Sequence, residues 1–229
     1  MPLMPQNNLA YPVYITAGTS RGSGFYCNTS IASYLVTAKH VLFKNGLELY
    51  DRRASLISIA NDLTHKIELE ADCQALLDSN DLKKHQTADV AVMRIAAVQE
   101  GVANLLQPVR KLNQLPPGVG ILGLAENNMR PIAAVGISNE IILFGYPSSL
   151  GREAQIDRSR PLLRRGIVAG KTEDARIIID CPVYFGNSGG LVLEMEQEAL
   201  GQIRFRGIGL AVEMVPFVEE LWSRQFNTK

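Results

Sequence analysis

The sequence has few of the residues that build metal sites, disulfide frameworks or membrane spans. Three cysteines and three histidines occur in 229 residues, and the cysteines (Cys27, Cys73 and Cys181) are odd in number and lack zinc-type spacing. No apolar run approaches the roughly 18 residues that span a bilayer. The N-terminus has neither the basic segment nor the apolar block of a secretory signal. We therefore expect a cytoplasmic protein with free thiols, no metal, no cofactor and no membrane contact.

An excess of charge of either sign is also missing. Lys plus Arg and Asp plus Glu number 23 each, and 46% of the residues are hydrophobic. A balanced chain offers no bulk attraction for nucleic acid or for anionic lipid. The apolar content is that of a globular protein with a sizeable core. The composition thus indicates a globular protein that does not bind nucleic acid.

Alternating or β-branched segments of strand length dominate the chain, and they fall into two series. The first series comprises residues 11–17, 32–38, 54–60, 65–71 and 89–96. The second series comprises residues 140–146, 166–171, 175–180, 189–194 and 203–212. Two series of this size predict an all-β protein with two barrels or sandwiches joined by a long connection.

The chain divides accordingly into three parts. Pro and Gly residues within 98–134 indicate the connection, so we expect a first β-unit over residues 1–97 and a second over 135–229. The end of the second unit differs, because "VPFVEELWSRQF" has the apolar spacing of an amphipathic helix and Pro216 suits its first turn. The sequence predicts a C-terminal helix there.

The segment "CPVYFGNSGGLVLE" (181–194) places Ser188 among glycines directly before a strand. A serine in this position is either a turn residue or a nucleophile, and the positions of the histidines decide which catalytic orders are possible. All three histidines (His40, His65 and His85) precede Ser188. The α/β-hydrolase order needs a histidine after the serine, and the subtilisin order needs an acid before the histidine. No Asp or Glu precedes His40, so the order histidine, acid, serine remains.

His40 and Asp89 stand where such a site needs them. "YLVTAKHVL" ends an apolar strand just before His40, and "QTADVAVMRI" places Asp89 at the entrance of a buried strand. An imidazole must take the serine proton, and a carboxylate must fix the tautomer of that imidazole. Both would come from the first β-unit and Ser188 from the second, so a cleft between the units would collect all three. His85 is the rival base, and His65 is interpreted as a solvated strand position.

The glycines around Ser188 also fit this chemistry. The backbone N–H groups of Gly186 and Ser188 would point at the oxyanion that develops on a substrate carbonyl. The absence of a side chain at Gly186 allows that backbone geometry. We expect these two amides to form an oxyanion hole.

Together these segments resemble the catalytic blocks of chymotrypsin-like (trypsin-fold) serine peptidases. "LVTAKHV", "TADVAVMRI" and "GNSGGLV" occur in this order and spacing, and "GSGF" and "RRGIVAG" match in context. The likeness is closest to the bacterial trypsin-like and Deg-type branch, and it extends over about residues 22–213. It implies a double six-stranded antiparallel β-barrel. It also implies a serine endopeptidase with His40 as general base, Asp89 as its orienting acid and Ser188 as nucleophile.

Departures from the digestive branch of that family are informative. Asn187 stands where the digestive enzymes carry an aspartate that pairs with a newly cleaved N-terminus. A neutral amide gives a buried ammonium no charge partner, so we do not expect activation by N-terminal cleavage. Val41 follows His40 directly, so the disulfide that flanks the family's histidine is missing. We also expect no PDZ-type module, and these departures suit a cytoplasmic enzyme made without a pro-segment.

The resemblance also implies the walls of a specificity pocket. They map to Pro182, Val183 and Tyr184 before the nucleophile, and to Leu210, Ala211 and Val212 about 20 residues after it. Pro182 takes the place of the aspartate that selects Lys or Arg in trypsin-type members. We therefore expect an apolar residue before the cleaved bond.

Three functions stay open on the sequence alone. The leading one is an endopeptidase that acts on protein or peptide substrates through an acyl-enzyme. The second is an esterase with the same triad, and the third is an inactive or switchable binding protein on a peptidase scaffold. The presence of His40, Asp89, Gly186 and Ser188 argues against the third, because a degenerate site usually loses at least one of them. The sequence predicts neither the physiological substrate nor the oligomeric state nor a regulator.

Overall fold

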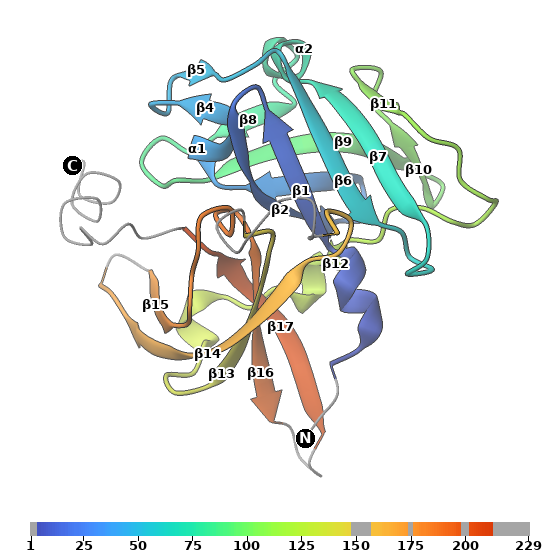
Figure 1. Ribbon diagram of the computed structural model, residues 1–229. Coiled ribbons are helices and arrows are strands. Elements are labelled where there is room, and N and C mark those ends of the chain that lie inside the picture. Colours follow the sequence, from blue (N-terminus) through green and yellow to red (C-terminus); the bar gives the residue numbers. More distant parts are fainter. Residues whose placement is uncertain (1–3, 148–156, 174–175, 198–201, 213–229) are drawn as a thin grey trace.

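Two large curled sheets dominate the described part of the chain, and Figure 1 shows them one above the other. The computed structural model describes residues 4–147, 157–173, 176–197 and 202–212. Within these ranges the regular structure is mainly antiparallel strand with a few short helices. The prediction of an all-β double barrel is confirmed. The expected C-terminal helix lies outside the described residues.

The first sheet has ten strands in the order β10-β9-β3-β2-β1-β6-β7-β11, with β12 beside β2 and β8 beside β9. They are β1 (Pro12–Ala17), β2 (Ser20–Asn28), β3 (Ala32–Thr37), β6 (Arg53–Ile59), β7 (Lys66–Asp72), β8 (Leu82–Lys84), β9 (Ala91–Gln99), β10 (Val102–Leu105), β11 (Val109–Lys111) and β12 (Leu124–Ala125). Buried and more exposed residues alternate along β6 and β7, because successive side chains of a strand point to opposite faces. The sheet curls around its apolar face, which contains Ile15, Leu35, Leu56, Leu69 and Ile95.

The second sheet has the order β15-β14-β13-β16-β17 in the described part of the chain. Its strands are β13 (Glu140–Gly145), β14 (Leu162–Lys171), β15 (Ile177–Asp180), β16 (Leu191–Gln197) and β17 (Ile203–Leu210). All four pairs are antiparallel. The apolar face forms a smaller core of Val135, Ile141, Leu143, Val168, Val192 and Ala211.

Short elements connect the strands. The α-helices are α1 (Lys39–Leu42) and α2 (Cys73–Asp78), the 3-10 helices are η1 (Gln6–Ala10), η2 (Glu126–Asn128) and η3 (Ile132–Ala134), and β4 (Phe43–Lys44) pairs with β5 (Glu48–Leu49). Among the described residues no helix is long and apolar enough to cross a membrane.

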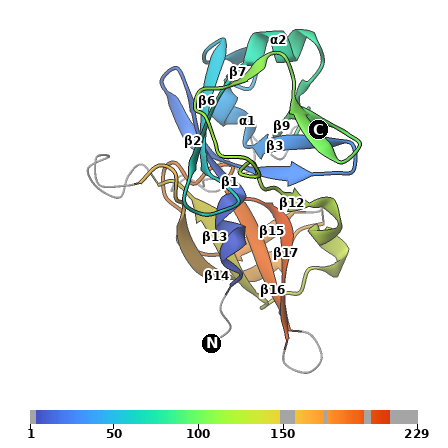
Figure 2. The same cartoon turned by 90° about the vertical axis from the view of Figure 1, so that its right-hand side faces the viewer.

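An apolar cluster joins the two sheets, whose ribbons meet in the middle of Figure 2. Its buried members are Tyr11, Phe25, Leu124, Phe144, Leu191 and Leu193. Phe25 and Leu124 come from the first sheet, whereas the last three come from β13 and β16 of the second. The hydrophobic effect therefore holds the sheets together along β2 and β12 on one side and β13 and β16 on the other.

The segment expected as the inter-barrel connection contains regular structure. Strand β10 pairs with β9, β11 pairs with β7, and β12 pairs in parallel with β2. The first sheet therefore extends to Ala125, and η2 and η3 lead from there to β13. The domain boundaries at residues 97 and 134 stay a prediction.

A buried ion pair fixes this connection to the second sheet. Glu194 of β16 is fully buried, and its Oε1 accepts hydrogen bonds from the Gly136 N–H at 2.8 Å and the Asn139 Nδ2 at 2.7 Å. Its Oε2 lies 3.1 Å from the Arg130 guanidinium, which also pairs with Glu196. Oε1 thus accepts two hydrogen bonds, whereas Oε2 has the ion pair with Arg130 but no hydrogen bond in the described structure. The buried charge therefore depends on all three contacts.

We expect Glu194→Gln to lower the free energy of unfolding by about 3 kcal/mol, because breaking a buried pair leaves the other charge without its partner. Glu140→Gln is the matched control. It removes the partner of Arg165 from a pair whose side chains are 47% and 50% exposed, and it should change stability by less than about 1 kcal/mol. Urea unfolding of the three proteins measures the difference. Equal losses would show that the Glu194 pair does not hold the connection.

Candidate active site

His40 lies in the first turn of α1, which begins where β3 ends. The next two residues, Val41 and Leu42, are buried in the first core. They anchor the helix and leave the His40 side chain at the surface, with 41% of it exposed. The strand end and the short helix together place an imidazole at the edge of the first sheet.

Asp89 holds His40 at two points. Its Oδ1 accepts a hydrogen bond from the backbone N–H of His40 at 2.9 Å, and its Oδ2 lies 2.5 Å from the ring Nδ1. A carboxylate can only accept, so Nδ1 carries the proton and the Nε2 of the neutral ring is left as a base. Asp89 is 4% exposed. One buried carboxylate thus fixes both the position and the tautomer of the ring.

The charge of Asp89 is stable in this environment. Burial acts to raise the pKa of Asp89, but the hydrogen bonds and the charge of His40, together with the charge of Lys39, outweigh burial and lower the pKa. Asp89 is therefore ionised at neutral pH and can stabilise an imidazolium on His40.

The Ser188 loop (residues 182–190) packs directly against the start of α1. Gly189 has a φ of 86°, and a Cβ there would lie 2.1 Å from the Ser23 carbonyl oxygen, 2.5 Å from Thr37 Oγ1 and 2.8 Å from the Ala38 nitrogen. Only glycine allows both this φ and this approach. Ala38 caps the helix that carries His40, so the backbone after Ser188 touches the backbone before His40.

Ser23 of β2 links the first sheet to the Ser188 loop through two of its atoms, its backbone nitrogen and its Oγ. Its N–H donates to the Ser188 carbonyl at 2.8 Å. Its Oγ donates to the Gly186 carbonyl at 2.6 Å and accepts from the Tyr146 N–H at 2.9 Å. Its carbonyl accepts from Thr37 Oγ1 at 2.7 Å. Ser23 is fully buried, so these hydrogen bonds are shielded from water.

The residues before Ser188 form a tight turn. The Asn187 N–H donates to the Tyr184 carbonyl, and the Gly190 N–H donates to the Asn187 carbonyl, both at 2.9 Å. Gly186 has a φ of 96°, which a side chain would strain. The Arg164 guanidinium of β14 covers the Tyr184 ring at 4.8 Å from its centroid. The predicted oxyanion-hole residues therefore lie in a turn supported from both sheets.

The predicted pocket residues fall into two groups. The Gly189 N–H donates to the Ala211 carbonyl at 2.7 Å, and the Ala211 N–H donates to the Gly190 carbonyl at 2.8 Å, so the structure brings this segment beside the nucleophile loop. Val183 packs against the core that contains Ala211. Pro182 and Tyr184 are exposed, and Val212 is half-buried. Leu210 points instead toward the first core and the inter-sheet cluster.

The other histidines serve local turns. His65 Nδ1 lies 2.5 Å from Asp62 Oδ2 in an exposed turn that Thr64 also joins, so the histidine expected on a strand forms a second histidine–aspartate pair outside the Ser188 loop. His85 Nδ1 accepts a hydrogen bond from the Ala88 N–H at 2.9 Å. His65 also makes a two-point contact with a carboxylate, because its backbone N–H donates to Asp62 Oδ1 at 3.1 Å. That carboxylate is 29% exposed, whereas Asp89 is 4% exposed and holds a histidine on the helix that the Ser188 loop packs against.

The cysteines are free, as expected. Burial raises the pKa of all three thiols, that of Cys73 to about 12. A protonated thiol is a poor nucleophile, so Cys181 is no rival to Ser188. Within the described ranges, no group of three or more His, Cys, Asp and Glu side chains could hold a metal ion.

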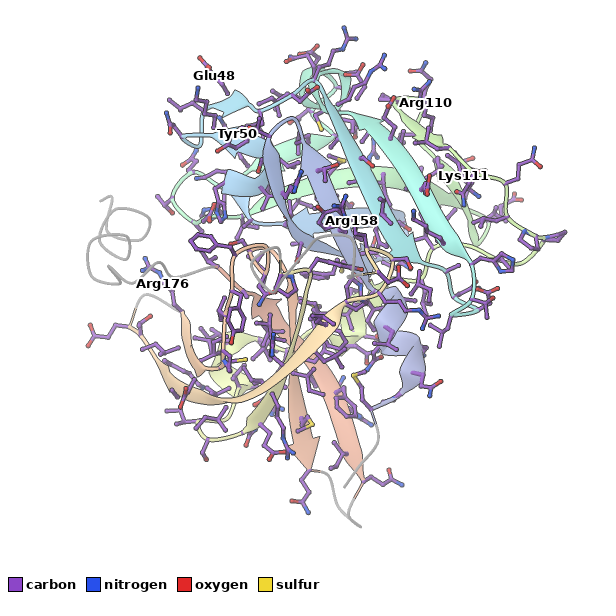
Figure 3. The ribbon with its side chains drawn as sticks, viewed as in Figure 1. Glu48, Tyr50, Arg110, Lys111, Arg158 and Arg176 are labelled. Atoms are coloured by element: carbon purple, nitrogen blue, oxygen red, sulfur yellow. The ribbon has the colours of Figure 1, made fainter. Side chains whose placement is uncertain are left out.

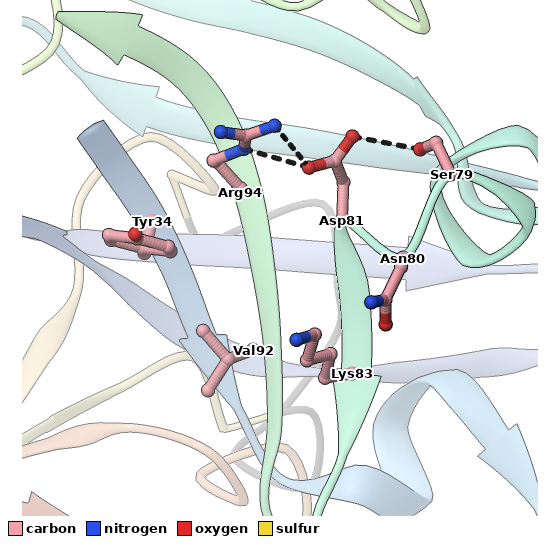
Figure 4. A pocket seen from close by; sticks show the side chains of 7 residues that line it. All are labelled: Tyr34, Ser79, Asn80, Asp81, Lys83, Val92 and Arg94. Carbon is pink, nitrogen blue, oxygen red and sulfur yellow. Dashed lines mark hydrogen bonds and ion pairs between the residues drawn. The ribbon is translucent and has the colours of Figure 1, made fainter. Parts of the chain in front are cut away.

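A pocket of about 400 Å³ lies on the first sheet near α2 (Figure 4). Its lining includes Asp81 and Arg94, which pair at 2.6 Å, while Ser79 Oγ donates to the same carboxylate at 2.8 Å. The lining also contains a second basic residue, Lys83, and the pocket contains none of the predicted catalytic residues.

The arginines near residue 160 are tied into the fold. Arg158 lies near the boundary of the two sheets, 5.4 Å from the centroid of the Tyr14 ring (Figure 3). Arg160 donates to the Leu63 carbonyl at 3.0 Å, and Arg165 pairs with Glu140. These contacts place arginines against other parts of the protein.

Two curled antiparallel sheets with the Ser188 loop at their junction are the arrangement that the sequence led us to expect of a double-barrel serine hydrolase. The model of the trypsin-like peptidase domain matches residues 22–201, so the chain belongs to the trypsin-like peptidase domain family and is a serine endopeptidase of that family. The resemblance seen in the sequence is confirmed.

The solved structure of Deg5 supports this fold, and two further structures align at lower TM-scores. The crystal structure of Deg5 aligns at a TM-score of 0.53 and 16% identity, over 93% of this chain and 83% of that one. A serine endoprotease from Yersinia pestis aligns at a TM-score of 0.47 and 18% identity, over 92% and 63%. The HtrA-type protease AlgW aligns at a TM-score of 0.47 and 13% identity, over 90% and 60%. The chain spans less than two thirds of the last two proteins, and no curated protein sequence matches it.

The pKa of Asp89 predicts how the clamp on His40 affects stability. A carboxyl whose pKa is lowered by folding stabilises the protein above its unfolded pKa of about 4, and this stabilisation disappears as the pH falls through the folded pKa. The loss of stability caused by Asp89→Asn should therefore be largest above about pH 5 and shrink toward pH 3. Urea unfolding across this range measures it. Asp180→Asn, at an exposed carboxyl, is the control, and a loss independent of pH would contradict the assignment.

Proposed function

We propose that this endopeptidase hydrolyses peptide bonds with Ser188 as nucleophile, His40 as general base and Asp89 as the acid that orients it. The amides of Gly186 and Ser188 form the oxyanion hole. The single observation that supports the proposal best is the two-point contact of Asp89 with His40, because it leaves Nε2 as the one free nitrogen of a ring at the edge that the Ser188 loop packs against.

The reaction follows from these roles. Ser188 Oγ attacks the carbonyl carbon of the substrate while His40 Nε2 takes its proton, and the negative charge develops on the carbonyl oxygen near the two amides. The C–N bond then breaks, and His40 returns the proton to the leaving amine. Water attacks the acyl-enzyme with its proton passing to Nε2, and that proton goes back to Ser188 Oγ as the new carboxylic acid leaves.

Asp89 is the reason that the base works at neutral pH. Its carboxylate stabilises the imidazolium that forms in each half of the reaction. Without it the ring can turn or adopt the other tautomer, and the proton on Nε2 would block the attack. An Asp-to-Asn change at such a position lowers kcat by about 10⁴ while the fold is kept.

The proposal predicts covalent labelling by a fluorophosphonate probe. The native protein should be labelled, and Ser188→Ala and His40→Ala should not, because the first lacks the nucleophile and the second lacks its base. Asp89→Asn should be labelled about 10⁴ times more slowly. Mass spectrometry of the labelled peptide locates the adduct. His85→Ala is the matched control for loss of a histidine, and its labelling rate should equal that of the native protein.

Peptide and ester substrates then separate the two hydrolytic functions. An endopeptidase cleaves an internal peptide bond in a casein digest or a fluorogenic peptide library, whereas an esterase acts on activated esters alone. A native protein that is not labelled would contradict the proposal and favour a scaffold whose oxyanion loop is not competent.

A further inference from the structure

Ser23 is a buried hydroxyl that the mechanism above does not use. We propose that Ser23 is a positioning residue, and that its hydroxyl holds the backbone of residues 186–188 from the first barrel in the conformation that binds the oxyanion. This inference rests on the proposed function, since it assigns a cause to the shape of the proposed oxyanion hole.

The direction of both Ser23 hydrogen bonds is fixed by their partners. The Tyr146 N–H can only donate, so Oγ accepts there at 2.9 Å. The Gly186 carbonyl can only accept, so Oγ donates there at 2.6 Å. A single hydroxyl with one proton satisfies both, and it therefore joins the end of β13 to the Ser188 loop.

The bond to Gly186 completes a clamp on one peptide unit. The peptide between Gly186 and Asn187 is planar, and both of its polar groups are bonded. Its carbonyl accepts from Ser23 Oγ, and its N–H donates to the Tyr184 carbonyl at 2.9 Å. These groups lie on opposite sides of the peptide unit, so the two bonds fix its orientation.

The two proposed oxyanion donors lie in the peptides on either side of this clamped unit. The Gly186 N–H belongs to the peptide before it and the Ser188 N–H to the peptide after it. A third bond, from the Ser23 N–H to the Ser188 carbonyl at 2.8 Å, holds the far side of Ser188. Ser23 thus restrains the chain on both sides of the donors without touching the substrate.

The side chains of the loop supply little of this restraint. Gly186 has a φ of 96°, and glycine adopts either sign of φ at little cost, so the sequence does not exclude a rotated peptide. Asn187 is neutral and 1% exposed, and its Nδ2 has no hydrogen-bond partner in the structure as described. An ion pair at position 187 therefore does not hold the turn.

The test compares Ser23→Ala and Ser23→Cys with the native protein. Both variants remove the strong donor: alanine leaves no polar atom, and cysteine leaves a larger, weakly donating thiol. Amide hydrogen exchange of the segment 182–190 should rise at least tenfold, because the Gly186 carbonyl loses its donor and the turn opens more often. Ser58→Ala removes an equally buried hydroxyl from β6, and it should leave this exchange unchanged.

The labelling rate, kcat and KM separate a positioning role of Ser23 from a general loss of stability. In both Ser23 variants the fluorophosphonate labelling rate and kcat should fall about ten- to a hundredfold, since a displaced donor loses part of the 10²–10³ that one oxyanion donor provides. KM and the pH at half-maximal rate should not change, because His40 and Asp89 are intact. Ile67→Val, which weakens the first core, is the control for lost stability.

The outcomes distinguish this inference from the proposed function. Unchanged exchange in the Ser23 variants overturns the inference whatever the native activity is. Faster exchange over the whole first sheet, or a changed KM with normal kcat, also overturns it, because either result indicates a structural or substrate-binding role. A third outcome is faster exchange confined to 182–190 in the Ser23 variants, together with no labelling of the native protein. It would support the positioning role of Ser23 and reject the proposed peptidase mechanism instead.

Discussion

The hydrogen bond from Ser23 to the Gly186 carbonyl is the contact on which the arrangement of the candidate site depends. His40 and Asp89 come from one sheet and Ser188 comes from the other. The relative positions of the three side chains therefore depend on the junction between the sheets. The apolar cluster around Phe25 and Phe144 supplies adhesion. Apolar contact is non-directional, however, and by itself it does not fix the rotation of a peptide plane.

Apolar packing and directional hydrogen bonds also have separate roles around His40. Val41 and Leu42 bury apolar side chains and keep α1 in place, while Asp89 determines the orientation and the tautomer of the ring. The contact of Asp89 with the His40 backbone is as important as its contact with the ring. Because one carboxylate binds both, a shift of the helix relative to Asp89 would directly change the position of the imidazole.

The sequence was sufficient for the fold class, and it named candidate catalytic residues that stay a prediction. Strand alternation indicated two β-units, and the order of His40, Asp89 and Ser188 left one catalytic arrangement. It was not sufficient for residues 98–134, because β10, β11 and β12 are too short for a recognisable alternation and form only through pairing with longer strands. The role of Ser23 was also missed. "GSGF" was visible as a block, but a serine between glycines shows no partner until the fold brings Gly186 beside it, 163 residues away.

Position 189 shows why a loop of this kind must be oriented from outside. A Cβ at Gly189 would overlap the Ser23 carbonyl, so the loop can approach the first sheet only if it gives up side chains there. Residues 186–190 include three glycines, so few side chains are available for packing. Hydrogen bonds to the backbone groups are then the main way to hold the segment. Ser23 uses two of them, the carbonyls of Gly186 and Ser188, and leaves the amides of these residues to the substrate. The glycines that allow the two sheets to meet therefore create the need for the buried serine that holds them.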